Sequence, residues 1–307
     1  MKKILVTGSN GLVGQKLTDL ILSQSDFYLI ATSKGENRHP NQTGYIYINL
    51  DICNVENVRQ VLKKHRPTTV IHTAAMTNVD ACERDQLVCR NLNVDAVRNL
   101  AVICREINCQ LIHLSTDFIF DGEDGPYTEL DKPNPLSFYG QTKLEAEQLL
   151  IASSCHWVIL RTIIVYGIVK DLSRKNIVLW AKETLERGDS IQIVNDQWRM
   201  PTLAEDLAAC CLLAIKQHAQ GVYNASGKDM MSMVELVEQV ADFWHLDKSL
   251  IHPISSSNLA QAAKRPKRTG FVLDKSMNNL GYRPHSFKEG LAILDNQLQQ
   301  LKESSAI

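Results

Sequence analysis

Short runs of apolar residues alternate with segments of helical periodicity through the first half of the chain. In the helical segments apolar residues recur every three or four positions, as at Val13, Leu17 and Ile21, which places them on one helix face. The apolar runs predict strands over Lys3–Thr7, Phe27–Thr32, Tyr45–Asp51, Thr69–Ala75, Gln110–Thr116 and Trp157–Thr162. Because these strands alternate with helices and are apolar throughout, we expect an α/β fold with a doubly wound parallel sheet of the Rossmann type.

The pattern changes after Gly167. Helical periodicity then dominates, over Asn176–Arg187, Ala204–Gln217, Ser232–Trp244 and Ser286–Lys302, and short apolar pieces at Ile191–Val194 and Val222–Asn224 interrupt it. We therefore expect one domain over residues 1–168 and a smaller α+β domain built mainly from residues 169–307, with an interleaved boundary.

The composition narrows the class of protein. Of the 307 residues, 44% are hydrophobic and 22% are charged, which is typical of a folded cytosolic protein. The net charge of -1 provides no broad basic surface, so neither nucleic acid nor an anionic membrane is an expected partner. No apolar run is long enough to cross a bilayer, and the first run breaks at Gly8. We expect no membrane span, no signal peptide and a cytoplasmic location.

The cysteines and histidines give no sign of a disulfide framework or a metal centre. The eight cysteines include no C-x-x-C pair and most lie in apolar runs, so we expect reduced thiols in the core. The nine histidines lack the paired spacing of zinc ligands, and the motifs predict no metal site. We expect the following to be packing residues because of their apolar surroundings: His72, His113, Trp157, Trp180 and Trp244.

Three glycines follow the first expected strand at the spacing G-x-x-G-x-x-G and open the next helix. Gly8 permits a tight turn, Gly11 lets the backbone approach a diphosphate, and Gly14 lets the helix pack close to the sheet. The helix N-terminus offers N–H groups and a partial positive charge to phosphates. The turn therefore predicts a dinucleotide-binding domain over residues 1–168, and the residues between the glycines that are expected to line it are Asn10, Leu12 and Val13.

The end of the second expected strand indicates which dinucleotide binds. An acid at the end of this strand would hold the ribose 2′-hydroxyl of NAD, but the first acid after the strand is Glu36. Ser33, Lys34 and Arg38 are suited to a 2′-phosphate and predict NADP(H), although Lys34 and Arg38 can also be read as solvated loop charges. Further cofactor contacts are expected at the ends of the third and fourth strands, from Asp51, Ile52, Ala74, Ala75 and Met76.

A second motif carries the candidate chemistry. Tyr139 and Lys143 stand four residues apart, on one face of an expected helix. A protonated Lys143 beside the phenol is expected to lower the pKa of Tyr139 and fit it for proton transfer. Ser115 and Thr116 end the fifth expected strand, at the sheet edge where ligands bind, and a hydroxyl there can hydrogen-bond a substrate carbonyl.

These motifs resemble those of the extended short-chain dehydrogenases/reductases and, more narrowly, of the dTDP-4-dehydrorhamnose reductase family. The matching stretches are residues 72–80, 115–122, 134–140 and 161–167, with Asp196-Gln197, Pro201-Thr202 and Arg265-Pro266. The resemblance therefore spans nearly the whole chain.

The resemblance implies roles for the four candidate catalytic residues. Thr116, with Ser115 as the rival, would hold the C4 carbonyl of a sugar nucleotide. Tyr139 would protonate the developing alkoxide, and Lys143 would bind the nicotinamide ribose. The implied reaction is NADPH-dependent reduction of dTDP-4-dehydrorhamnose to dTDP-rhamnose, with a substrate-binding domain over residues 169–307.

The sequence leaves other functions open. One rival is a sugar-nucleotide epimerase of the same fold, and another is a non-catalytic NADP-binding regulatory subunit. A dehydratase is disfavoured because only one acid, Asp117, follows Thr116, and Asp117 either orients the site or caps a turn. The resemblance also suggests a homodimer, and magnesium, which some members of the family carry, has no assignable ligands in this sequence.

The chain departs from the family pattern in one place that concerns the substrate. Trp198, Arg199 and Met200 stand where the reductases tend to have a small residue. We expect these bulky residues to reshape the sugar pocket, or Arg199 to pair with a diphosphate. The interval between Thr116 and Tyr139 is also slightly short, which predicts a trimmed loop.

Overall fold

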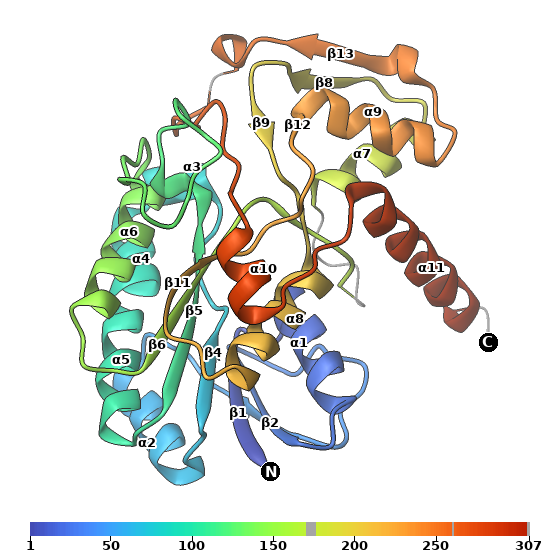
Figure 1. Cartoon of the computed structure of the whole chain (residues 1–307). Helices are drawn as coiled ribbons and strands as arrows, with labels where there is room; N and C mark the ends of the chain where they lie inside the picture. Colours follow the sequence, from blue (N-terminus) through green and yellow to red (C-terminus); the bar gives the residue numbers. More distant parts are fainter. Residues whose placement is uncertain (170–175, 260, 306–307) are drawn as a thin grey trace.

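The centre of the molecule is a parallel sheet. A computed structural model describes residues 1–169, 176–259 and 261–305. In this part of the chain seven strands form one sheet in the order β11-β6-β5-β4-β1-β2-β3 (Figure 1). The strands are β1 (Lys2–Thr7), β2 (Phe27–Ser33), β3 (Ile46–Asn49), β4 (Thr69–His72), β5 (Gln110–Thr116), β6 (Trp157–Thr162) and β11 (Gly221–Asn224). All neighbours pair in parallel, which confirms the predicted sheet.

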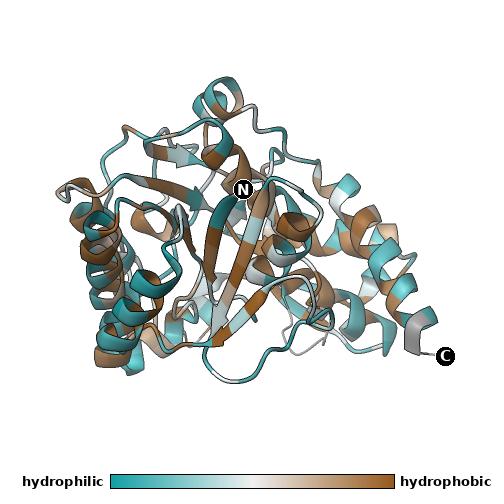
Figure 2. Cartoon of the chain, turned by 90° about the horizontal axis from the view of Figure 1, so that it is seen from below, coloured by the Kyte–Doolittle hydropathy of each residue, from teal (hydrophilic) through white to brown (hydrophobic). Residues whose placement is uncertain are grey.

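Helices cover both faces of this sheet, as a doubly wound fold requires. One face packs against α1 (Leu12–Leu22) and α8 (Ala204–Lys216), where Ile4 and Val6 of β1 meet the two helices. The other face packs against α2 (Val55–His65), α5 (Ala96–Glu106) and α6 (Phe138–Ile151), where Leu5 points. Figure 2 shows the hydrophobic strands between helices whose outer sides are hydrophilic. Continuous apolar runs therefore encode burial on both faces.

Two expected strands are longer than the observed ones. The third strand covers only Ile46–Asn49, and the fourth ends at His72. The backbone leaves the sheet after His72, which pairs with the last residue of β1, Thr7. The backbone N–H and the hydroxyl of Thr73 both donate to the carbonyl of Thr7. The next residues therefore turn towards the edge of the sheet as a loop.

Short helices connect β4 to α5. They are α3 (Val79–Arg84), α4 (Gln86–Arg90) and the π-helical turn η1 (Asn91–Asp95), which runs directly into α5. After β5 the short helix η2 (Asp117–Ile119) begins, and the side chain of Thr116 caps it by accepting from the Phe118 N–H.

A second hydrophobic cluster lies beyond the carboxyl ends of the strands (Figure 1). Its helices are α7 (Ile177–Glu186), α9 (Met233–Phe243) and α11 (Phe287–Ser305), and β8 (Ile191–Val194) pairs with β13 (Ile251–Ile254). Smaller pairs are β7 (Val165–Tyr166) with β10 (Thr202–Leu203) and β9 (Trp198–Arg199) with β12 (Met231–Ser232). The remaining elements are α10 (Asp274–Leu280), η3 (Lys248–Leu250) and η4 (Ser256–Asn258).

The helices expected in the second half occur close to their predicted positions. The position of the domain boundary stays a prediction. Two elements that follow residue 169, α8 and β11, pack with the large sheet and not with the second cluster. The eight cysteines are all free thiols, and all except Cys53 are buried. No helix in the described ranges combines the length and apolar character needed to span a membrane.

Candidate active site

The glycine turn follows the carboxyl end of β1, and its glycines have no side chains to keep a ligand away from the backbone. Gly8 has a φ of +70°, and a Cβ there would lie 2.8 Å from the backbone N of Ala74. A Cβ on Gly14 would lie 2.3 Å from the carbonyl oxygen of Gly8. Gly11 precedes α1 and supplies no side-chain cap to its first turn. This part of the chain therefore fits the diphosphate of a dinucleotide.

The glycine turn borders a cavity of about 700 Å³ at the carboxyl ends of the strands. The cavity brings together nine of the predicted site residues: Gly11, Leu12, Val13, Ala74, Ala75, Ser115, Thr116, Tyr139 and Lys143. The other predicted cofactor residues do not line it: Gly8, Asn10, Gly14, Ser33, Lys34, Arg38, Asp51, Ile52 and Met76. The chemical and diphosphate parts of the prediction thus converge in one cavity, and the remaining residues lie outside it.

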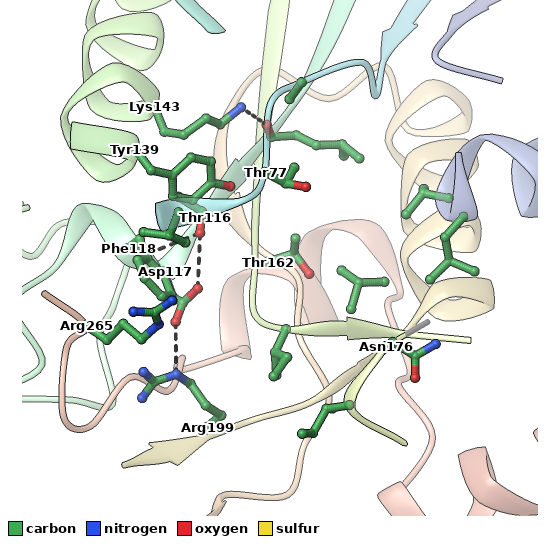
Figure 3. Close-up of a pocket in the computed structure, with 18 of the residues that line it drawn as sticks. Thr77, Thr116, Asp117, Phe118, Tyr139, Lys143, Thr162, Asn176, Arg199 and Arg265 are labelled. Carbon is green, nitrogen blue, oxygen red and sulfur yellow. Dashed lines mark hydrogen bonds and ion pairs between the residues drawn. The ribbon is translucent and has the colours of Figure 1, made fainter. Parts of the chain in front are cut away.

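Tyr139 and the end of β5 face one another (Figure 3). The Thr116 hydroxyl donates to Oδ1 of Asp117 over 3.1 Å and accepts from the Phe118 N–H over 3.2 Å. The ring of Phe118 meets that of Tyr139 edge-on, with 5.8 Å between centroids. Burial raises the pKa of Tyr139, and hydrogen bonding to Thr116 lowers it in part. The phenol therefore keeps its proton across the neutral range.

Lys143 does not act on Tyr139 in the way the motif predicts. Its Nζ donates to the Leu114 carbonyl over 2.6 Å and lies 3.1 Å from Nε2 of His113, so the ammonium is turned towards β5. Burial lowers the pKa of Lys143 to about 8. The expected fall in the pKa of Tyr139 is wrong for this arrangement, because burial of the phenol outweighs the groups that lower it.

The two histidines of the sheet are buried, as expected, but they are part of the site. Their rings stack with 5.6 Å between centroids, and the Thr7 hydroxyl lies 2.7 Å from Nδ1 of His72. Burial lowers the pKa of His72 to about 3 and that of His113 well below its usual value. The sequence pattern showed only that His113 was in a strand, and the contact with Lys143 was missed.

Asp117 and Arg199 form a buried ion pair at the wall of the cavity. Arg199 Nε lies 3.8 Å from Oδ2 of Asp117, and the two side chains are 4% and 2% exposed. The guanidinium also donates to the carbonyls of Trp198, Pro266 and Lys267. These bonds hold Arg199 against Asp117, and a role in binding diphosphate stays a prediction.

The cavity also has lining residues that sequence reasoning missed or placed elsewhere. Trp180 was expected to be a packing residue, which is wrong, because it lines the cavity and is 36% exposed. Arg265 lines it too and is held by Asp80 through an ion pair of 2.6 Å. Other lining residues that had no predicted role are Thr77, Thr162, Asn176 and Gln197. Thr77, Thr162, Gln197 and Arg265 lie in stretches that match the family, which was the signal present in the sequence, whereas Asn176 is identified only by its position in the fold.

The loop after β2 is fixed by Asn10. The Asn10 side chain accepts from the backbone N–H of Arg38 over 2.9 Å and donates to the carbonyl of Glu36 over 2.7 Å. Asn10 therefore positions the loop that contains the predicted 2′-phosphate ligands. Similarly, Met76 is held through its N–H, which donates to the side chain of Asn93 over 2.9 Å.

Lys34 and Asp51, predicted separately as cofactor contacts, bind each other. Their charged atoms are 2.8 Å apart, and Lys34 is 81% exposed. Hydrogen bonding to Lys34 lowers the pKa of Asp51. Ser33 ends β2 beside them, and Ile52 is buried. The described residues contain no group of three His, Cys, Asp or Glu side chains placed to hold a metal, so magnesium has no assigned ligands.

Comparison with known proteins agrees with this geometry. A sequence model of the family described as RmlD substrate binding domain matches residues 1–300. The methionine adenosyltransferase 2 subunit beta of Danio rerio is 29% identical over 87% of this chain and 81% of its own. The dTDP-4-dehydrorhamnose reductase of Aggregatibacter actinomycetemcomitans is 28% identical over 95% of this chain and 97% of its own.

Solved structures of similar proteins share the fold. A dTDP-4-dehydrorhamnose reductase from Clostridium acetobutylicum has a TM-score of 0.85 and 29% identity, covering 97% of this chain and 99% of that one. A dTDP-4-dehydrorhamnose reductase from Bacillus anthracis in complex with NADP has a TM-score of 0.82 and 26% identity, covering 97% and 100%.

Proposed function

Because the chain belongs to the RmlD substrate binding domain family and is an NAD(P)-dependent oxidoreductase of the extended short-chain dehydrogenase/reductase type, we propose that it uses NADPH to reduce the C4 keto group of a deoxysugar nucleotide. The first candidate substrate is dTDP-4-dehydrorhamnose, and the product is then dTDP-rhamnose. The observation that carries the proposal is the convergence of Tyr139, Thr116 and Lys143 with the glycine turn in one cavity.

The proposed roles follow from the hydrogen-bonding capacity of each group. When bound, NADPH supplies the hydride that C4 accepts. On substrate binding the Thr116 hydroxyl turns its hydrogen from Asp117 to the C4 carbonyl oxygen, and Tyr139 gives its proton to that oxygen as negative charge develops there. Ser115 is the rival for the first role, since its buried hydroxyl has no partner among the described residues. Lys143 binds the nicotinamide ribose.

A direct assay tests this function. Oxidation of NADPH is measured against a panel of 4-keto deoxysugar nucleotides that includes dTDP-4-dehydrorhamnose, with NADH as the comparison. We expect consumption of one NADPH for each 4-hydroxy product formed. A panel that gives no NADPH consumption contradicts the proposal, and interconversion of sugars without net consumption indicates the epimerase instead.

A second candidate function has support from one specific observation. Several of the similar proteins, from Danio rerio, Rattus norvegicus and others, carry the name methionine adenosyltransferase 2 subunit beta. The chain would then bind NADP and regulate another protein without turning over a sugar nucleotide. Cofactor binding with no turnover of any sugar in the panel favours this second candidate.

Further proposals concern the cofactor, the assembly and the location. We propose that NADP(H) is preferred over NAD(H), because no acid precedes Glu36 at the end of β2 and Lys34 stands there instead. A sugar nucleotide is the proposed partner, and a homodimer and a cytoplasmic location remain proposals.

Replacing Lys34 by alanine tests the cofactor preference. We expect the KM for NADPH to rise about tenfold, because a hydrogen bond between two charged groups is lost, and the KM for NADH to stay unchanged. Lys63→Ala is the matched control, since Lys63 is also exposed and paired with one carboxylate, Glu106. An equal rise for both cofactors would show that Lys34 does not contact the 2′-phosphate.

A further inference from the structure

Lys143 is a buried cation whose hydrogen bonds are only partly supplied by the strand beside it. An ammonium group has three N–H donors and needs an acceptor for each when it is buried. Lys143 is 3% exposed, and it forms no ion pair with a described carboxylate. One N–H donates to the Leu114 carbonyl over 2.6 Å, and the nitrogen lies 3.1 Å from Nε2 of His113. Two donors are thus directed at β5, which leaves the third for the cavity.

The protonation state of His113 follows from its position. The ring is buried, its pKa lies well below the usual value, and the neighbouring charge of Lys143 opposes a second positive charge. A neutral imidazole has one donor and one acceptor nitrogen. Because Nε2 faces an ammonium group, Nε2 is the acceptor and Nδ1 carries the hydrogen.

His113 is expected to lower the stability of the folded protein compared with an apolar residue at the same position. Its Nδ1 has no hydrogen-bond partner in the described structure, and a buried donor without a partner costs free energy. The neighbouring positions in β5, Leu111, Ile112 and Leu114, are apolar, as a buried strand normally is. The contact with Lys143 is the interaction that a leucine at this position would not provide.

His72 supports the ring from the neighbouring strand. Residues 72 and 113 are paired across β4 and β5, and the two rings lie at 21° to each other. The Thr7 hydroxyl, 2.7 Å from Nδ1 of His72, connects the stack to β1. The orientation of the His113 ring is therefore set by three strands of the sheet and not by solvent.

We propose that His113 is a positioning residue, which accepts a hydrogen bond from Lys143 through Nε2 and holds the ammonium so that its remaining N–H faces the cofactor ribose. The inference rests on the proposed function, because it has a consequence for catalysis only if Lys143 binds the cofactor. The other titratable groups around Lys143 are Glu147 on α6, Cys89 on α4 and His72 on β4.

The kinetic test compares two substitutions at this position. His113→Leu removes the acceptor, and we expect kcat with NADPH and dTDP-4-dehydrorhamnose to fall roughly 10- to 100-fold. Burial lowers the pKa of Lys143 to about 8, and we expect the alkaline limb of the kcat profile to follow this group and to move to lower pH, because the ammonium has lost an acceptor. His113→Gln places an amide oxygen near the position of Nε2 and restores most of the rate and the profile. Leu111→Val is the control for damage to the same buried strand.

A spectroscopic test separates this inference from the proposed function. The ¹⁵N shifts of histidine in the NADP-bound protein, assigned by comparison with His113→Gln, are expected to show His113 protonated at Nδ1 at neutral pH. Protonation at Nε2 overturns the proposal, as does a His113→Leu enzyme whose rate and pH profile match those of Leu111→Val. The spectrum decides the matter even if His113→Leu does not fold or if no sugar nucleotide is turned over.

Discussion

Replacing Tyr139 by phenylalanine is expected to lower kcat for NADPH oxidation by about 10²- to 10⁴-fold, the range typical of a lost proton donor. The phenol is buried, and burial raises its pKa, so it holds its proton until charge develops on the substrate oxygen. Phenylalanine keeps the ring that packs against Phe118 and removes only the hydroxyl. The expected result is therefore a large loss of rate with little change in NADPH binding.

The control for this experiment is Tyr223→Phe. Tyr223 is also buried, but it lies on the edge strand β11, does not line the cavity and is expected to tolerate the loss of its hydroxyl. Titration of each variant with NADPH, followed by fluorescence, separates binding from chemistry. If Tyr139→Phe retains the wild-type kcat, the proposed proton transfer is wrong, and a cellular role that survives the change favours the regulatory candidate.

Replacing Arg199 by methionine is expected to cost about 3–5 kcal/mol of stability at neutral pH, because it leaves a buried carboxylate without its partner. Burial raises the pKa of Asp117, and the Arg199 guanidinium works against that rise. Without Arg199 the pKa of Asp117 rises further. A carboxyl whose pKa is higher in the folded than in the unfolded protein stabilises the fold at low pH and loses that contribution as pH rises through the folded value.

The stability lost in Arg199→Met is therefore expected to depend on pH, which unfolding experiments can measure. Urea unfolding at pH 5 and pH 8 is expected to show a smaller deficit for Arg199→Met at pH 5, where Asp117 is more readily protonated, than at pH 8. Arg187→Met is the control, since Arg187 pairs with Asp189 on the surface and such pairs contribute about 0.2–1 kcal/mol. A deficit that is equal at both pH values would show that the charge of Asp117 is not responsible.

The features that sequence patterns predicted are those encoded by neighbouring residues. The glycine turn, the strands and the pair Tyr139 and Lys143 each occupy a short segment, and their spacing maps directly onto helix and strand geometry. The length of β4 was overestimated because the strand ends where its neighbour β1 ends, at Thr7, which is distant in sequence. Local apolar character continues past the point where the sheet ends.

The contacts that were missed join residues far apart in the chain. Arg199 reaches Asp117 across 82 positions, and neither residue has a local pattern that indicates the other. The same holds for His113 and Lys143, where an apolar strand context predicted a packing residue. Lys34 and Asp51 follow the second and third strands along the chain, but their mutual ion pair depends on the pairing of β2 with β3 and not on the spacing of the residues.

Gly140, next to Tyr139, determines how near α6 comes to the end of β5. A methyl group at this position would stand only 2.2 Å from the Phe118 carbonyl oxygen, so any other amino acid would push the helix outward. The gap between the phenol and the Thr116 hydroxyl is thus controlled by main-chain contact rather than by side-chain flexibility. A residue that takes no part in proton transfer decides whether both hydroxyls can reach one substrate oxygen.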